Sequence, residues 1–188
     1  MSASLSARPA SFSRVTITEL MIPSYANFGG KIHGGILLSM MDKVAYTAAT
    51  KHSGAYCVTV SVDTVDFLQP VEVGELVSLK ASVNHVGNSS MIIGIKVISE
   101  NVKTGVVKHT NTCYFTMVAK GEDDKPTPVP PLLLETRTDV RRFVEAIKRK
   151  KYKSEYGAIL KELKRTWDQE AISTMLKGQR CEVSLDIK

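Results

Sequence analysis

The sequence predicts an α+β fold, in which an antiparallel β-sheet packs against one long buried helix and a helical extension follows at the C-terminus. Residues 33–50 are apolar in nearly every direction around a helix axis. Four later stretches alternate apolar and polar residues with a period of two, as strands do. A proline-rich segment then precedes sequence with helical periodicity, which indicates a separate helical extension.

The first expected element is a strand at residues 13–21, because SRVTITELM is rich in β-branched residues and roughly alternating. After a loop that runs to Gly30, the helix spans His33 to Thr50. Apolar residues on all of its sides are typical of a buried helix. They are Ile36, Leu37, Leu38, Met40, Met41, Val44, Ala45, Ala48 and Ala49.

Four strands are expected after the helix, at residues 58–70, 77–84, 91–97 and 106–120. The turn-forming pairs Gly87-Asn88 and Thr104-Gly105 separate the last three. Close turns make neighbouring strands antiparallel, so the four strands are expected to form a meander. A single sheet covers only one side of a helix that is apolar all round, and a second subunit is the simplest cover for the other side.

Segment 121–132, GEDDKPTPVPPL, has four prolines and no periodicity, which marks a domain boundary. We expect a tail at residues 1–12, a core domain at 13–134 and a basic helical extension at 135–188. Thr138 can cap a helix whose apolar stripe is Val140, Phe143, Val144 and Ile147. A second helix that starts near Ser154 can run on to Leu176, with an apolar stripe at Ile159, Leu160, Leu163 and Trp167.

The net charge of +6 is concentrated in the extension, since residues 1–134 hold 11 basic and 10 acidic residues and residues 135–188 hold 14 and 9. The extension has few aromatic residues and mixes both signs of charge, so nucleic-acid binding is not expected. The longest apolar stretch, residues 36–49, falls short of the roughly 20 residues that span a membrane.

Cysteine usage indicates a reducing compartment, because Cys57, Cys113 and Cys181 form no CxxC pair and are odd in number. We expect structural thiols and a cytoplasmic location. The first 18 residues contain two arginines, five serines and no acid, so a mitochondrial presequence stays open as an alternative.

Asp42 is the residue that most needs an explanation, because a carboxylate on an apolar helix carries a large desolvation cost unless it is paired or used. Ser39 and Tyr46 lie within its reach at i−3 and i+4, so these hydroxyls could satisfy it structurally. The helix also opens with Gly34-Gly35. Glycines at a helix N-terminus expose backbone N–H groups, as an oxyanion hole requires, although a bare pair also allows tight packing.

Asn27, Gly30, Gly34, Gly35 and Asp42 together form the pattern N-x-x-G-x-x-x-G-G-x-x-x-x-x-x-D. This pattern resembles the acyl-CoA hydrolase branch of the hotdog family. The resemblance continues through CVTVSVDTVDFLQPVEVGELV, HVGNSSM and PVPPL, and covers approximately residues 13–133. It implies a hotdog fold, with the sheet wrapped around the helix, dimers with continuous sheets, often three dimers in a hexamer, and two active sites per dimer.

The resemblance further implies hydrolysis of acyl-CoA to a fatty acid and coenzyme A, which is part of substrate and product rather than a cofactor. Asp42 of one subunit would activate water or attack directly, Asn27 of the other would position water or thioester, and the Gly35 N–H would stabilise the oxyanion. The remaining expected substrate-binding residues are His33, Gly34, Thr59, Asn88, Ser89 and Ser90.

The turn at residues 87–90 is where the resemblance places the coenzyme A phosphates, since hydroxyls and N–H groups can meet phosphate oxygens there. Asn88 stands where the family more often has arginine, so a basic residue from a neighbour or the tail is expected to compensate. An ordinary hairpin turn is the alternative interpretation.

Two other functions remain open from the sequence. An acyl-thioester dehydratase or hydratase shares the architecture, but its catalytic histidine usually lies in a proline- and glycine-rich loop before the helix, whereas His33 abuts the helix start and the proline pattern is absent. A non-catalytic acyl-CoA sensor could use the basic helices to contact another macromolecule. No metal is expected, because His33, Cys57 and His109 have no ligand spacing.

Overall fold

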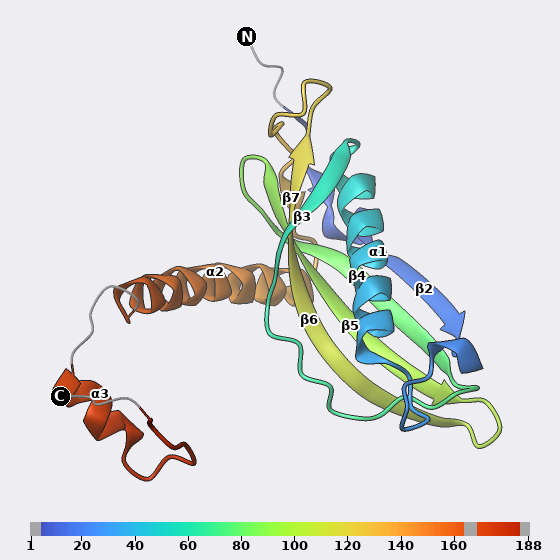
Figure 1. The fold of residues 1–188 in the computed structure, drawn as a ribbon. Coiled ribbons are helices and arrows are strands. Elements are labelled where there is room, and N and C mark those ends of the chain that lie inside the picture. The colour runs from blue at the N-terminus through green and yellow to red at the C-terminus, as the bar shows by residue number, and fades with distance from the viewer. Residues whose placement is uncertain (1–4, 164–168, 185–188) are drawn as a thin grey trace. The chain divides into compact units, whose positions relative to one another are not determined.

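The computed structural model describes residues 5–163 and 169–184. Figure 1 shows one curved sheet and a long helix that packs on it. The elements in chain order are β1 (Arg8–Pro9), a 3-10 helix (Ala10–Ser13), β2 (Val15–Leu20), a second 3-10 turn (Pro23–Tyr25), α1 (Gly34–Ser53), β3 (Tyr56–Val62), β4 (Leu76–Val86), β5 (Ser90–Asn101), β6 (Val106–Lys120), β7 (Leu132–Leu133), α2 (Arg137–Leu163) and α3 (Gln169–Leu176).

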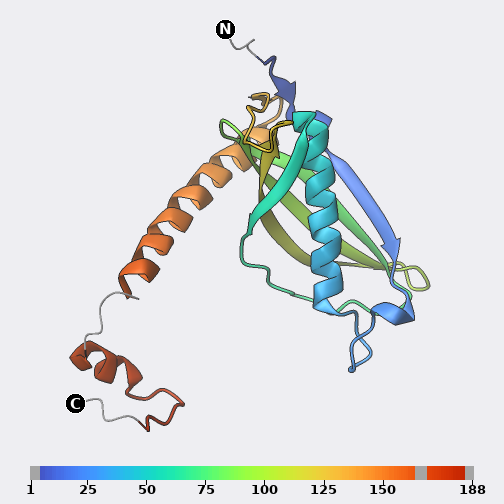
Figure 2. The ribbon, with the colours of Figure 1, turned by 45° about the horizontal axis from the view of Figure 1, so that its top comes forward.

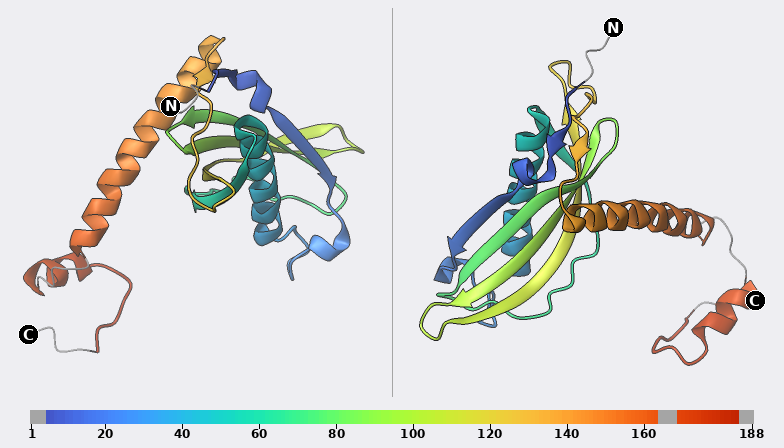
Figure 3. Two further views of the ribbon diagram at one scale, coloured as in Figure 1. Left: turned by 90° about the horizontal axis from the view of Figure 1, so that it is seen from above. Right: turned by 180° about the vertical axis from the view of Figure 1, so that it is seen from behind.

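The main sheet has five strands in the order β2-β4-β5-β6-β3, and every neighbouring pair is antiparallel. β2 and β3 are therefore the two edges. The helix α1 lies against one face of this sheet (Figure 2). The view from behind in Figure 3 shows β4, β5 and β6 side by side on the opposite face.

The core lies between α1 and the inner face of the sheet. Because successive strand residues point to opposite faces, every second residue of β4, β5 and β6 enters this core. Met41 and Val44 of α1 are fully buried against Leu79, Ile93 and Phe115 of the sheet. Cys57 and Cys113 are buried as well and Cys181 is exposed, so the first two serve as small apolar core residues.

As expected, the sheet covers only one face of α1, and a second subunit as the cover for the other face stays a prediction. One face packs on the sheet, whereas Leu38 and Tyr46, each 39% exposed, lie on the open face with Asp42. An apolar helix face that stays open marks a surface that another molecule can cover.

The predicted four-strand meander is correct for β4, β5 and β6 and wrong for β3. β3 pairs with β6, and β4 takes β2 as its other neighbour. The connection from β3 to β4, residues 63–75, is long, and its one hydrogen-bonded turn among the described contacts, Glu72 to Glu75, comes just before β4. It runs beside β6, where the Leu68 N–H donates to the Thr110 carbonyl at 2.9 Å.

The segments that flank the sheet take part in the fold. β1 pairs in parallel with β7, so the strand Arg8–Pro9 lies within the residues that we assigned to a tail. In the proline-rich segment, Val129 is buried and its N–H donates to the Asn88 carbonyl. By its internal contacts the chain divides into two compact units, of which the first ends at Ala146 and the second begins at Ile147.

The start of α2 belongs to the first unit. Thr136, rather than the predicted Thr138, caps it, because the Thr136 hydroxyl accepts from the Asp139 N–H while the Asp139 carboxylate accepts from the Thr136 N–H. Phe143 packs on the ring of His85. The predicted break near Ser154 is wrong, since α2 is continuous to Leu163. Trp167 lies outside the described residues.

No helix among residues 5–163 and 169–184 is long and apolar enough to cross a membrane.

His52, at the end of α1, is a fully buried histidine whose Nε2 donates to the Pro130 carbonyl at 2.9 Å. Its Nδ1 has no hydrogen-bond partner among the described residues. Burial lowers the pKa of this imidazole; the Pro130 hydrogen bond opposes that effect and the charge of Arg8 adds to it. The folded protein therefore holds His52 neutral.

We predict that wild-type stability falls as the pH drops below the unfolded histidine pKa. Between that value and the lower folded pKa, the unfolded chain binds the extra proton and is favoured. Urea unfolding at about pH 7.5 and about pH 5.5 should show a loss of at most about 1.4 kcal/mol from this group. The His52→Gln variant should lack that part of the loss. An identical pH dependence in both proteins would contradict the prediction.

Candidate active site

A short hairpin, residues 26–32, leads into the N-terminus of α1. Ala26 and Ile32 form an antiparallel bridge, and Gly30 turns the chain with a φ of 75°. The Asn27 Oδ1 accepts the N–H groups of Gly29 at 2.9 Å and Lys31 at 3.2 Å. The side-chain oxygen of Asn27 thus holds the hairpin. The residue is exposed, and its amide NH₂ has no hydrogen-bond partner among the described residues.

His33 caps α1 directly after this hairpin. Its Nδ1 accepts the Gly35 N–H at 2.9 Å, so the backbone donor that we predicted for an oxyanion is occupied in this structure. The Phe67 ring lies over Gly34, where an added Cβ would come within 3.4 Å of it. Glycine at position 34 therefore allows the loop after β3 to approach the start of the helix closely.

Asp42 lies two turns further along α1, on its open face. The hydroxyl of Thr59 in β3 donates to Asp42 Oδ1 at 2.5 Å and also approaches Met117 Sδ at 3.2 Å. Among the described residues, neither Ser39 nor Tyr46 donates to this carboxylate, and Oδ2 accepts no hydrogen bond. Thus a strand residue, not a neighbour on the helix, orients Asp42.

A cavity of about 550 Å³ opens beside this carboxylate, between α1 and β3. Tyr46 and Tyr56 meet edge to face on its rim with ring centroids 6.2 Å apart. The other lining residues are Asp42, Lys43, Thr47, Cys57, Val58, Thr59 and Met117. The sequence did not identify Tyr56 or Met117 as site residues, because their place depends on the pairing of β3 with β6.

The turn between β4 and β5 lies at the same end of the sheet as Thr59. Ser90 pairs with Val118, which in turn pairs with Val58 across β6. Two strand spacings, roughly 10 Å, therefore separate Ser90 from the residue next to Thr59. The backbone carbonyls of Asn88 and Ser89 accept from Val129 and Ala119, while the Asn88 side chain is exposed.

The structure does not join Asn27 to Asp42 within one chain. No hydrogen bond links them among the described residues, and the helical rise from Gly34 to Asp42 alone is about 12 Å. The predicted residues thus form three groups: Asp42 with Thr59, the turn at residues 87–90 near that pair, and Asn27 with His33, Gly34 and Gly35 at the start of the helix.

Several large apolar side chains are exposed on the elements that carry these groups. Phe28, at the tip of the hairpin, is fully exposed, with a relative exposure of 112%. The edge strand β3 adds Val60 and Val62, and the loop after it adds Phe67 and Leu68. Exposed apolar side chains that gather in patches are typical of protein or ligand interfaces.

Burial raises the pKa of the Cys113 thiol to about 12, so it stays protonated. No group of three His, Cys, Asp or Glu side chains within the described ranges could hold a metal ion.

Comparisons with known proteins identify the family of this chain. Residues 29–106 match the model of the Thioesterase superfamily. The chain is 46% identical over 141 residues to protein VdlD of Helicobacter pylori, a match that spans 75% of this chain and 80% of that protein. It is 36% identical over 137 residues to the uncharacterized acyl-CoA thioester hydrolase YkhA of Bacillus subtilis, spanning 73% and 80%.

The chain also resembles solved structures of acyl-CoA thioesterases and hydrolases. A hexameric acyl-CoA thioesterase superposes with a TM-score of 0.79 at 35% identity, covering 82% of this chain and 99% of that chain. The acyl-CoA hydrolase of Staphylococcus aureus, solved with butyryl coenzyme A, coenzyme A and coenzyme A disulfide, superposes with a TM-score of 0.75 at 27% identity, covering 85% and 99%.

We predict that His33→Ala lowers the free energy of unfolding by about 1 kcal/mol, because a helix cap is lost and the Gly35 N–H becomes unpaired. His33→Asn should retain most of the stability, since asparagine caps helices well. Urea denaturation of the three proteins tests this. Equal stability of His33→Ala and wild type would show that the cap contributes nothing.

Proposed function

Because this chain belongs to the thioesterase superfamily, we propose that it hydrolyses acyl-CoA thioesters to a free fatty acid and coenzyme A. The resemblance drawn from Asn27, the glycines and Asp42 is confirmed at the level of the family. The observation that carries the proposal is the exposed Asp42 carboxylate, which borders a cavity and is held through one oxygen by Thr59. The names of the relatives support the substrate class.

In the proposed reaction, Asp42 takes a proton from water as that water attacks the thioester carbonyl carbon. The carbon–sulfur bond breaks, and the proton goes to the departing sulfur, so that coenzyme A leaves as the thiol. Direct attack by Asp42, followed by hydrolysis of the anhydride, gives the same products. Both routes need a carboxylate oxygen that accepts no hydrogen bond. Within the described residues, Asp42 Oδ2 meets this requirement.

The negative charge that develops on the carbonyl oxygen needs donors, and the Gly35 N–H and the Asn27 amide NH₂ are the groups we assign to it. Gly35 must first give up its bond to His33. Since the helix rises about 10 Å between Gly35 and Asp42, these donors cannot reach the carbonyl that the same chain's Asp42 attacks. We therefore assign Asn27 and Gly35 to one subunit and Asp42 to the other.

This division requires a homo-oligomer, at least a dimer and in our proposal a trimer of dimers. A second copy would cover the open face of α1 and the edge strand β3, whose exposed apolar residues support an interface there. The hexameric relative supports the larger assembly. Phe28 would enter the interface with the hairpin that delivers Asn27.

For coenzyme A, we propose that Asn88, Ser89 and Ser90 meet the phosphates while the acyl chain lies against Tyr46 and Tyr56. The strand register supports this placement, because Ser90 lies in the same cross-strand row as Val58, the neighbour of Thr59. The free thiols of Cys57 and Cys113 fit the cytoplasmic location that we propose.

We predict that Asp42→Asn and Asn27→Ala each lower kcat by on the order of a hundredfold or more, because each removes a group that acts on the reacting atoms. Thr59→Val should cause a smaller loss, since it only frees the carboxylate to rotate. Thiol release from acetyl-, medium- and long-chain acyl-CoA is the measurement. Asp123→Asn, which removes an exposed carboxylate elsewhere, is the control and should match wild type.

Two results would contradict this proposal. Tight acyl-CoA binding without turnover in the wild type would favour a sensor. Hydration of an enoyl-CoA without thiol release would favour a hydratase.

We also predict that mixing two inactive variants, Asp42→Ala and Asn27→Ala, restores activity. When Asp42→Ala and Asn27→Ala chains are unfolded together and reassembled in equal amounts, about a quarter of all sites should combine intact Asp42 and Asn27 from different chains. Each variant reassembled alone should stay inactive. If the two residues act within one chain, the mixture will be as inactive as its components.

A further inference from the structure

The face of the sheet opposite α1 holds a second, larger cavity of about 740 Å³. It shares no lining residue with the cavity beside Asp42. β4, β5 and β6 form its floor and the first turns of α2 form a wall, all within the first unit of the chain. Its volume lies within the range of about 300–1,000 Å³ that is usual for small-molecule sites.

The floor of this cavity places two like charges side by side. Lys80 and Lys96 are directly opposite each other on β4 and β5, flanked in the same row by Thr16 and Thr112. Like charges in that position destabilise a sheet. Neither lysine has a hydrogen bond or ion pair within the described residues, so the repulsion has no internal compensation.

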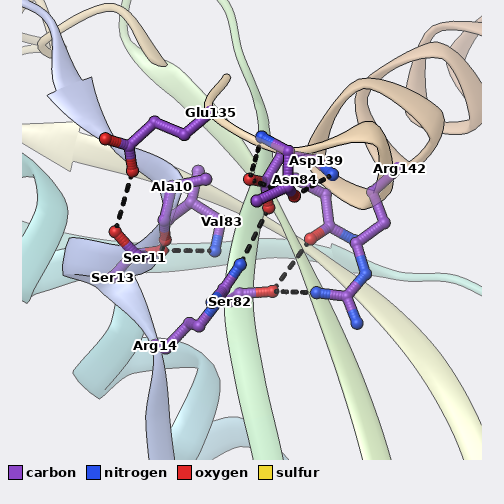
Figure 4. Close-up of polar contacts among 11 residues, drawn as sticks. Ala10, Ser11, Ser13, Arg14, Ser82, Val83, Asn84, Glu135, Asp139 and Arg142 are labelled. Atoms are coloured by element: carbon purple, nitrogen blue, oxygen red, sulfur yellow. Dashed lines mark hydrogen bonds and ion pairs between the residues drawn. The ribbon is translucent and has the colours of Figure 1, made fainter. Parts of the chain in front are cut away.

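Two arginines of α2 also line the cavity, and they differ in whether a carboxylate pairs with them. Arg141 is paired with Glu145 at 2.6 Å, the one carboxylate of the lining. Among the described residues, Arg142 reaches only the Ser82 hydroxyl, at 3.5 Å, and Figure 4 shows its guanidinium directed toward that residue. Lys80, Lys96 and Arg142 therefore leave about three positive charges facing one cavity with no acidic partner in the part of the chain that the structure describes.

The walls are held in place by buried polar contacts. Asp139, 4% exposed, binds Arg14 through one oxygen and the Thr136 cap through the other, which fixes the start of α2 against β2. Figure 4 shows this chain of contacts from the N-terminal segment to α2. On the floor, the Ser82 hydroxyl donates to Asn84 Oδ1 at 3.0 Å, and both residues are buried.

Gly94 completes the floor. A Cβ at this position would lie 2.1 Å from Asn84 Nδ2 and 3.3 Å from the Tyr114 ring. The absence of a side chain at Gly94 therefore lets the Asn84 side chain lie over β5 at this position.

We propose that this cavity is a binding site for a small molecule that carries two or more phosphate groups. Two ammonium groups, a guanidinium and the hydroxyls of Thr16 and Thr112 supply donors and positive charge, and phosphate oxygens accept both. A polyvalent anion between Lys80 and Lys96 relieves their repulsion. The site lies on the opposite face of the sheet from Asp42 and does not depend on the proposed hydrolase activity.

The test uses the full-length protein and inorganic tripolyphosphate, with binding measured by calorimetry at low salt. Wild type should bind, and Lys80→Gln with Lys96→Gln should weaken binding by at least about tenfold. The matched control is Lys103→Gln with Lys125→Gln, which removes the same charge from two turns that do not border the cavity. It should bind within about twofold of wild type.

A second measurement separates the site from a surface that merely attracts anions. Without anion, the Lys80/Lys96 double variant should melt no lower than wild type, because repulsion is removed, and tripolyphosphate should no longer raise its melting temperature. Asp42→Asn should bind tripolyphosphate as wild type does, so failure of the hydrolase proposal leaves this result intact.

Three outcomes would overturn the proposal: no binding to wild type, an equal loss in the control variant, or a smaller oligomer for the Lys80/Lys96 double variant in light scattering. The last would mean that this face is buried between subunits.

Discussion

The packing of α1 on a single sheet is the constraint from which the rest of the molecule follows. Met41 and Val44 are fully buried against β4, β5 and β6, and this fixes the rotation of the helix about its own axis. With that rotation fixed, Asp42 must face away from the core toward the edge strand β3, where Thr59 holds it. The carboxylate avoids the desolvation cost of a buried charge and keeps one oxygen free beside a cavity.

The helix α1 also keeps two groups of proposed site residues apart along its length. Asn27, His33 and the two glycines gather at its N-terminus, while Asp42 lies about 12 Å further on. A rigid helix cannot bring its own ends together, so a reaction that uses both groups needs a second chain. The exposed Phe28, Val60 and Val62 are consistent with that need, because they lie on the surfaces that would meet.

The two faces of the sheet have different chemistry because strand residues alternate. Leu79, Ala81, Ile93 and Ile95 point into the core, and the residues between them, including Lys80 and Lys96, point outward. On that outer face the Arg14–Asp139 ion pair fixes the start of α2 beside the lysines. Within the part of the chain that the structure describes, the cavity beside Asp42 and the cavity over Lys80 and Lys96 thus lie on opposite sides of one sheet.

Local pattern in the sequence determined the helix and the approximate positions of most strands, because periods of 3.6 and two follow from neighbouring residues alone, although the strand expected at residues 58–70 ends at Val62. The hotdog class followed from the resemblance of the Asn27–Asp42 motif to a known family, and the comparisons confirm it. Pairing was decided by tertiary structure: β3 lies beside β6 rather than β4, which brings Thr59, not Ser39 or Tyr46, to Asp42. A single helix pattern likewise could not show which side the sheet covers, and the contact of Asp139 with Arg14 joins residues 125 positions apart. Such contacts join residues far apart in the chain, and only the folded backbone brings them within reach.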